Sequence, residues 1–264
     1  MSGYKHKLPV FGFLVLALAV SAVFFQCSKN NDETQKKDEG IILGFSQIGA
    51  ESAWRDCNSR SIKAAAEEYG IQLLFDNAEQ KQENQIKAMR SFIAYQVDVI
   101  AFVPIVADGW DNILQEARDA GIPVLVTDRK IKTEDESLYA GFIGTDSEEE
   151  GRNAARFLLR KFENRIKASE TEKKPVQIIE ISGTEGSSPA VGRAAGFREL
   201  ISHYPEFEIV HSVSGDFLRS KGYEIMRKIL EDYNDIDVLY SHNDGMTLGA
   251  IDAMHEKGIK PGED

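Results

Sequence analysis

From residue 41 onward, short apolar runs alternate with longer segments in which apolar residues recur at helical spacing. The runs 41–45 and 97–103 are almost continuously apolar, which is typical of strands buried on both faces of a parallel sheet. Between such runs, residues 52–69 and 81–95 carry the apolar stripe of a half-buried helix. This alternation predicts an α/β fold, with parallel sheets flanked by helices.

The predicted strands and helices fall into two successive runs. In the first, we expect strands at 41–45, 71–75, 97–103, 123–127 and 138–143, with helices at 52–69, 81–95 and 109–120. In the second, we expect strands at 176–181, 207–213 and 238–240, with helices at 147–163, 188–203, 217–232 and 244–257. Two runs predict an N-terminal lobe over 41–145 and a C-terminal lobe over 146–264. Open α/β sheets bind ligands beyond the carboxyl ends of their strands, so the loops of both lobes are expected to share one cleft.

Polar and aromatic side chains follow the apolar strands, at the edge where such sheets bind ligands. Trp54 offers a flat apolar face, and Arg55 beside it offers a fork of donors. Asp128 and Arg129 directly follow the fourth strand and place a carboxylate beside a guanidinium. Sugar hydroxyl groups both donate and accept hydrogen bonds, so charged side chains in fixed positions hold them well. This inventory predicts a polyhydroxylated ligand.

The composition restricts the classes of partner and of chemistry. The 264 residues include 43 acidic and 31 basic side chains, which give a formal net charge of −12. Nucleic-acid binding needs a basic face, so we expect no nucleic-acid partner. Two cysteines are too few for a disulfide scaffold or a four-cysteine zinc site. No nucleophile motif, metal cluster or phosphate loop occurs, so we expect no metal, no cofactor and no enzyme activity.

Residues 1–27 have the pattern of an export signal. Lys5 and Lys7 precede an apolar stretch, and Cys27 is followed at once by a polar segment. The position of Cys27 predicts a bacterial lipoprotein whose lipidated N-terminus is that cysteine. A plain cleaved signal and an uncleaved membrane anchor stay open as alternatives. All three place the folded part in the periplasm or cell envelope, with residues 28–40 as a flexible tether.

Six stretches of the chain are familiar as a set. They are GFSQIGAESAWR (44–55), QKQENQIKAMRSF (80–92), DVIAFVPIVADGW (98–110), IPVLVTDR (122–129), SGDFLRSKG (214–222) and HNDGMTLGAI (242–251). Together they resemble the ribose-binding group of type I periplasmic binding proteins, the sugar receptors of ABC importers, and within it the galactofuranose binders. The resemblance implies a monomeric two-lobed receptor that binds a galactofuranose-like monosaccharide in its cleft, closes around it and delivers it to an ABC transporter permease. Only its N-terminal segment would meet the membrane.

The resemblance also implies roles for particular residues. Those expected to contact the sugar are Glu51, Ser52, Ala53, Trp54, Arg55, Asp128, Arg129, Arg193, Phe217 and Asn243. Asp146 and Asp244 are secondary candidates beside the hinge and the cleft. Pro189 and its neighbours precede Arg193 where relatives often have an acidic residue, so the specificity on that side of the cleft is less defined.

Relatives of this kind continue well beyond the position that corresponds to Asp264. The resemblance therefore implies that the C-terminal lobe is incomplete here, without a further cleft aspartate and the return crossings at the hinge. From this we expect weak or absent sugar binding by the chain as it stands. We also expect exposed apolar sheet edges, which invite aggregation.

Two other functions stay open. The same binding lobes would serve a receptor that feeds a chemoreceptor or a sensor kinase. A glycosidase would use paired carboxylates, for which Glu51 and Asp128 are an imaginable pair, although the arginines beside them favour holding over proton transfer. The residues also have structural interpretations: Asp128 and Arg129 as an ordinary surface pair, and Trp54 and Phe217 as core residues.

Overall fold

A computed structural model describes residues 40–167, 174–233 and 235–262. Within residues 40–144, five parallel strands form a sheet in the order β2-β1-β3-β4-β5. The strands are β1 (Ile42–Gln47), β2 (Gln72–Asn77), β3 (Val99–Phe102), β4 (Val124–Asp128) and β5 (Gly141–Gly144). The helices between them are α2 (Ala53–Glu68), α3 (Gln82–Tyr95) and α4 (Asp111–Asp119). The strand order reverses between β1 and β3, and open α/β sheets bind ligands at such a switch point.

Alternate residues of these strands face opposite sides of the first sheet. Ile100 and Phe102 pack with α3 and α4 around the fully buried Trp110. Phe45 and Ala101 face the other side, in a cluster that Ile62 of α2 joins. The period of two therefore buries both faces, as a parallel sheet requires.

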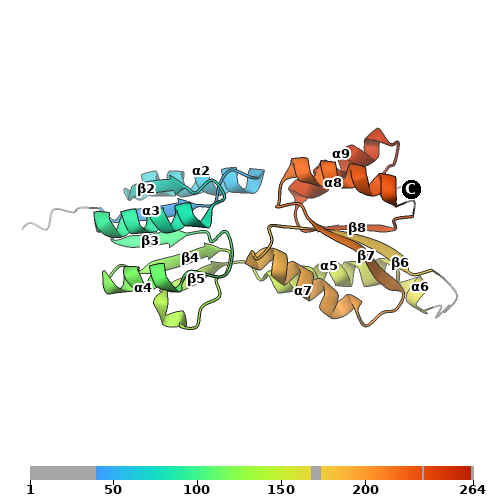
Figure 1. The fold of residues 1–264 in the computed structure, drawn as a ribbon, viewed down its shortest axis with the longest axis horizontal. Helices are drawn as coiled ribbons and strands as arrows, with labels where there is room; N and C mark the ends of the chain where they lie inside the picture. The colour runs from blue at the N-terminus through green and yellow to red at the C-terminus, as the bar shows by residue number, and fades with distance from the viewer. Residues whose placement is uncertain (1–39, 168–173, 234, 263–264) are drawn as a thin grey trace, which may run out of the picture. The chain divides into compact units, whose positions relative to one another are not determined.

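The second sheet has three parallel strands in the described chain, in the order β7-β6-β8. They are β6 (Val176–Ser182), β7 (Phe207–Ser214) and β8 (Val238–Ser241). The helices are α5 (Ser147–Lys161), α6 (Glu163–Lys167), α7 (Ser188–Ile201), α8 (Arg219–Asp232) and α9 (Asp244–Glu256). Helices α8 and α9 lie on one side of this sheet and α5 and α7 on the other (Figure 1). Ile179 and Ile181 pack with α8 and α9, whereas Val176 and Ile178 pack with α5 and α7. Each sheet with its helices is one lobe of the predicted two-lobed α/β fold.

Helices α5 and α7 approach each other closely enough to require glycine. A Cβ atom on Gly196 of α7 would lie 1.9 Å from the backbone oxygen of Glu148 of α5. Real side chains do not tolerate such a distance, so the sequence allows these two backbones to touch. The contact matters because α5 carries Glu150 and α7 carries Arg193, and both side chains belong to the site described below.

Most predicted boundaries differ from the structure by one or two residues, and the strand predicted at 138–143 differs more. The predicted strand at 138–143 is a 3₁₀ turn, η1 (Glu136–Leu138), followed by the shorter β5. Asp135 causes this, because its carboxylate accepts the backbone N–H of Ser137 at 2.9 Å and caps the turn. The helix predicted at 147–163 ends at Lys161. The helix predicted at 217–232 begins at Arg219, because Phe217 has a φ of 62°, outside the helical region.

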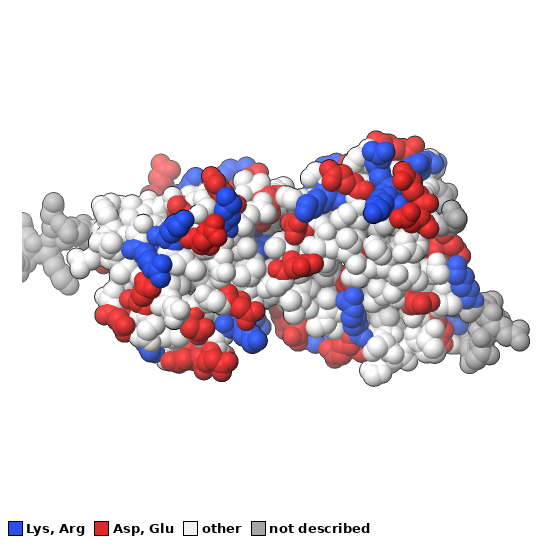
Figure 2. Space-filling model, viewed as in Figure 1, with Lys and Arg blue, Asp and Glu red and all other residues white. Residues whose placement is uncertain are grey.

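The predicted export signal at residues 1–27, the lipidation site Cys27 and the tether up to residue 39 lie outside the described residues. Among the helices that the structure does describe, none combines the length and apolar character needed to cross a bilayer. On the face shown in Figure 2, Lys and Arg are interspersed with Asp and Glu and do not gather into a basic patch.

Candidate functional site

A cavity of about 540 Å³ lies where the carboxyl ends of the strands of both sheets meet. All ten residues predicted to contact a sugar line it, namely Glu51, Ser52, Ala53, Trp54, Arg55, Asp128, Arg129, Arg193, Phe217 and Asn243. The secondary candidate Asp244 lines it too. The other, Asp146, is not among its lining residues, and its carboxylate instead caps α5 by accepting the backbone N–H of Glu149 at 3.0 Å.

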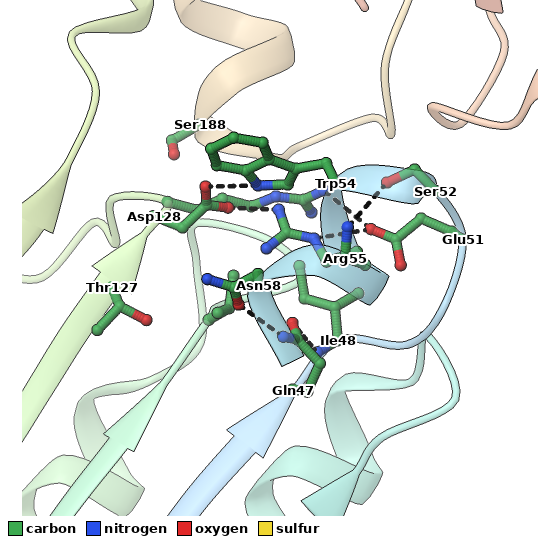
Figure 3. Close-up of polar contacts among 12 residues, drawn as sticks. Gln47, Ile48, Glu51, Ser52, Trp54, Arg55, Asn58, Thr127, Asp128 and Ser188 are labelled. Atoms are coloured by element: carbon green, nitrogen blue, oxygen red, sulfur yellow. Dashed lines mark hydrogen bonds and ion pairs between the residues drawn. The ribbon is translucent and has the colours of Figure 1, made fainter. Parts of the chain in front are cut away.

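The wall from the first lobe is built on Asp128 at the end of β4 and on the first turn of α2. Asp128 accepts hydrogen bonds from Trp54 Nε1, at 3.2 Å, and from an Nη atom of Arg55 (Figure 3). Arg55 Nε donates to Glu51 at 2.9 Å, and the Ser52 hydroxyl caps the helix. The Arg55 side chain is 4% exposed and that of Asp128 is 18% exposed, so water screens this pair little. The side chains are therefore fixed before any ligand enters.

Arg129 lies beneath this wall as a second, more deeply buried guanidinium. Its Nη1 atom donates to the backbone oxygen of Ile105 at 3.0 Å, and its Nη2 atom lies 3.9 Å from Glu51 Oε1. Burial and the neighbouring Arg55 charge lower the pKa of Arg129 to about 10, although Glu51 raises it. Arg129 is thus charged at neutral pH, and the folded protein holds that charge at a free-energy cost.

Three buried polar atoms of this wall have no hydrogen-bond partner within the described chain. They are Glu51 Oε2, Arg55 Nη1 and Arg129 Nε. A buried polar atom without a partner costs free energy, and such atoms are rare in folded proteins. Here they gather on side chains that line one cavity, and one acceptor stands beside two donors. A ligand carrying hydroxyl groups could satisfy all three.

The wall from the second lobe presents an aromatic ring and another arginine. Phe217 is 5% exposed, and its ring centroid lies 5.2 Å from Arg129 Cζ and 6.0 Å from Arg193 Cζ. Arg193 Nε donates to Glu150 at 2.9 Å. Asn243 caps α9 by accepting the backbone N–H of Met246 at 2.9 Å, and its amide donates to the backbone oxygen of Phe217 at 3.1 Å. The cap of one helix therefore also holds the backbone of the residue that carries the ring.

Two of these residues have left-handed backbone conformations that side chains disfavour. Asp128 has a φ of 63° and Phe217 a φ of 62°. Aspartate tolerates this region because its short carboxylate bonds locally, but an aromatic residue there is an outlier. Strained backbone of this kind collects at functional sites, where the surrounding structure holds it.

The comparison with known proteins now decides the family. Residues 43–263 match the family model of the periplasmic binding protein domain. The chain belongs to this family. Galactofuranose-binding protein YtfQ of Escherichia coli (strain K12) is 44% identical over 227 residues, which are 85% of this chain and 69% of YtfQ.

Two solved structures resemble this periplasmic binding protein in both sequence and fold. A Mycobacterium smegmatis protein in complex with β-D-fucofuranose is 48% identical, with a TM-score of 0.80, over 85% of this chain and 72% of that one. The periplasmic binding protein component of the arabinose ABC transporter of Shewanella sp. ANA-3, bound to α- and β-L-arabinofuranose, is 44% identical, with a TM-score of 0.78. That match covers 84% of this chain and 71% of the Shewanella chain. YtfQ and the Shewanella protein are binding proteins and the family model is that of a binding protein domain, so the interpretation as a binding protein and not an enzyme is confirmed.

Five further residues of this periplasmic binding protein line the cavity although they were not predicted as sugar contacts. They are Cys57, Thr145, Glu150, Pro189 and His242, of which Pro189 was expected beside the cleft. Cys57, a free and exposed thiol, follows Trp54 by three positions on α2, and that spacing alone could have indicated a shared face. In the sequence, Glu150 belongs to an acidic run that is typical of a solvated helix start. No local signal distinguishes it from the exposed acids beside it. Among the residues that the structure places, no group of His, Cys, Asp and Glu could hold a metal ion.

Proposed function

We propose that this periplasmic binding protein binds a monosaccharide in its five-membered, furanose ring form, in the cavity between its lobes. The observation that carries the proposal is the set of unpartnered buried atoms on Glu51, Arg55 and Arg129. Sugar hydroxyl groups supply both the donor and the acceptors that these atoms lack. Phe217 and Trp54 add apolar faces for the C–H side of a ring, as sugar sites commonly have.

The furanose ring form is supported by the relatives. The names or ligands of all three, a galactofuranose binder, a fucofuranose complex and an arabinofuranose complex, specify five-membered rings. Each is more than 40% identical to this chain. The ten predicted residues are proposed as the ligand contacts because they line the same cavity.

Delivery of the sugar to an ABC transporter is the second part of the proposal. The Shewanella relative is a component of such a transporter, and the family fold closes around its ligand by hinge motion. A location outside the cytoplasm follows from the same role and from the export signal predicted at residues 1–27. A closed, loaded receptor is the form that a permease would recognise.

The test is a titration of the purified full chain with D-galactose, D-fucose and L-arabinose, followed by calorimetry and by melting temperature. Each sugar equilibrates between pyranose and furanose rings in water. A ligand that binds only the folded state raises the melting temperature by mass action. We expect at least one of the three to bind and to raise it.

The matched control is the methyl β-pyranoside of each sugar, which cannot open to the furanose form. We expect these glycosides not to bind. Equal binding of a sugar and its locked pyranoside would contradict the furanose assignment. No binding of any of the three free sugars would contradict the proposed function for this chain.

A further inference from the structure

Glu180 is a buried carboxylate in the middle strand of the second sheet and does not line the sugar cavity. It lies on β6 with its side chain 1% exposed. A charge in such a position is costly unless it is paired and hydrogen-bonded. Its two oxygens accept hydrogen bonds from the guanidinium of Arg198, from the hydroxyl of Ser212 and from the ring of His242.

The contact with His242 gives the carboxylate a link to the cavity. Glu180 Oε1 lies 3.2 Å from His242 Nε2, while His242 Nδ1 accepts the backbone N–H of Gly183 at 3.4 Å. Because Nδ1 accepts, Nε2 carries the proton and donates to Glu180. The imidazole is therefore held from both sides in one tautomer and one orientation. His242 itself lines the cavity.

Two parts of the cavity wall rest on this histidine. Its backbone oxygen accepts Arg193 Nη1 at 2.8 Å. On its other side, Gly183 lies directly under the Phe217 ring, since a Cβ there would come within 1.9 Å of the ring carbon Cζ. Tyr240, whose ring lies 5.0 Å from that of His242, donates to the backbone oxygen of Arg193 at 3.1 Å.

We infer that Glu180 is a positioning residue for the sugar site, acting through His242 on Arg193 and Phe217. The inference rests on the proposed function, because it assigns a role within that same site. It makes a carboxylate outside the cavity a determinant of sugar affinity. The alternative is that Glu180 only stabilises the second lobe. In that case, replacing Glu180 would leave the affinity for the sugar unchanged.

The experiment compares Glu180→Met with the wild-type full chain. Methionine matches the volume of glutamate but offers no carboxylate to His242, while Arg198, 42% exposed, can turn to water. We expect the dissociation constant for the sugar identified in the titration above to rise about tenfold, the usual effect of losing a hydrogen bond to a charged group. We also expect the ¹⁵N signals of His242 to leave the Nε2-protonated pattern.

Two further variants separate positioning from stability. Glu180→Gln keeps an oxygen that can accept from His242, so we expect it to recover part of the affinity. Ser212→Ala removes a different hydrogen bond to Glu180 and leaves His242 untouched, so we expect a lower melting temperature and a dissociation constant within twofold of wild type.

The outcomes distinguish the two proposals. Absence of binding by the wild type would refute the proposed function. Wild-type binding together with an unchanged dissociation constant in Glu180→Met would overturn the positioning role. Should Glu180→Met show no cooperative melting, Glu180→Gln and Ser212→Ala decide instead. An unchanged dissociation constant and unchanged His242 signals in Glu180→Gln, together with weaker sugar binding by Ser212→Ala, would overturn the positioning role as well.

Discussion

Asp128 combines three roles, and an asparagine of the same size could not fill all of them. It accepts from Trp54 and Arg55 with different oxygens, and its backbone has a φ of 63°. Asparagine tolerates the same backbone but has only one acceptor oxygen. We therefore expect Asp128→Asn to fold normally and to bind the sugar at least tenfold more weakly by calorimetry. Glu116→Gln, in an exposed pair with Arg90, is the control and should bind as wild type does. Equal affinities in both variants would argue against the role of Asp128.

We expect Arg129 to lower the stability of the folded protein while it supports sugar binding. Its folded pKa of about 10 lies below the ordinary value of 12.5, so below pH 10 its charge opposes folding, and that cost disappears only as the pH rises from 10 to 12.5. The shift in pKa corresponds to a destabilisation of about 3 kcal/mol. Removing the guanidinium would relieve this cost, and losing its hydrogen bond to Ile105 would offset part of that gain. We expect Arg129→Met to melt a few degrees higher without sugar and to lose the sugar-induced shift. A lower melting temperature than wild type would contradict the predicted cost of burial.

Residues that directly follow an apolar strand were predictable, because the end of a parallel strand fixes where the next side chains lie. Asp128 ends β4 and Arg129 follows it, whereas Trp54 and Arg55 lie in the first turn of the helix after β1. Glu150 was not predictable in this way, because it reaches the cavity only through the packing of α5 against α7. His242 directly follows β8, and its buried side chain also lines the cavity.

At the scale of elements, most strands and helices were predictable from apolar runs and from the glycines that end helices. Gly70, with a φ of 64°, lies directly after the C-cap residue Tyr69 of α2. The misses occur where a side chain competes with regular structure, as Asp135 does before η1. The start of α8 is displaced because Asp216 and Phe217 both have left-handed backbones, which a helical spacing pattern cannot reveal.

The first residue of α7 joins the two lobes. The hydroxyl of Ser188 accepts the backbone N–H of Lys130, which follows β4, at 2.7 Å. Alanine is a better helix former than serine, so Ser188→Ala removes this bond without weakening α7. We expect the sugar to dissociate a few times faster, with little change in melting temperature. Ser202→Ala, at the opposite end of α7, is the control and should leave the rate unchanged. Identical dissociation rates in both variants would exclude a role for the bond.

At the scale of the whole molecule, Glu180 makes the free energy of unfolding depend on pH in the acidic range. Burial raises its pKa, but hydrogen bonds from His242, Arg198 and Ser212 outweigh burial and hold it at about 2, below the ordinary 4.5. A lowered pKa stabilises the folded state above pH 4.5, and this contribution, about 3 kcal/mol, is lost as the pH falls towards 2. We expect urea unfolding of the wild type to lose more stability between pH 5 and pH 3 than that of Glu180→Gln. Parallel losses would show that other carboxylates dominate.

The two-lobed architecture was predictable because strand and helix alternate in two runs. The boundary between the lobes at 145 and 146 remains a prediction. How α5 and α7 pack within the second lobe was not predictable, because it depends on close contacts such as that of Gly196 with Glu148.

The two tryptophans of the chain occupy opposite environments. Trp110 is fully enclosed between β3 and α4, whereas Trp54 is 59% exposed at the cavity and bonded to Asp128. In optical terms, the molecule carries one fluorophore that a ligand must disturb and a second that it cannot reach. The emission of Trp110 then serves as an internal standard, and the filling of the cavity is readable as a colour ratio from the unlabelled protein.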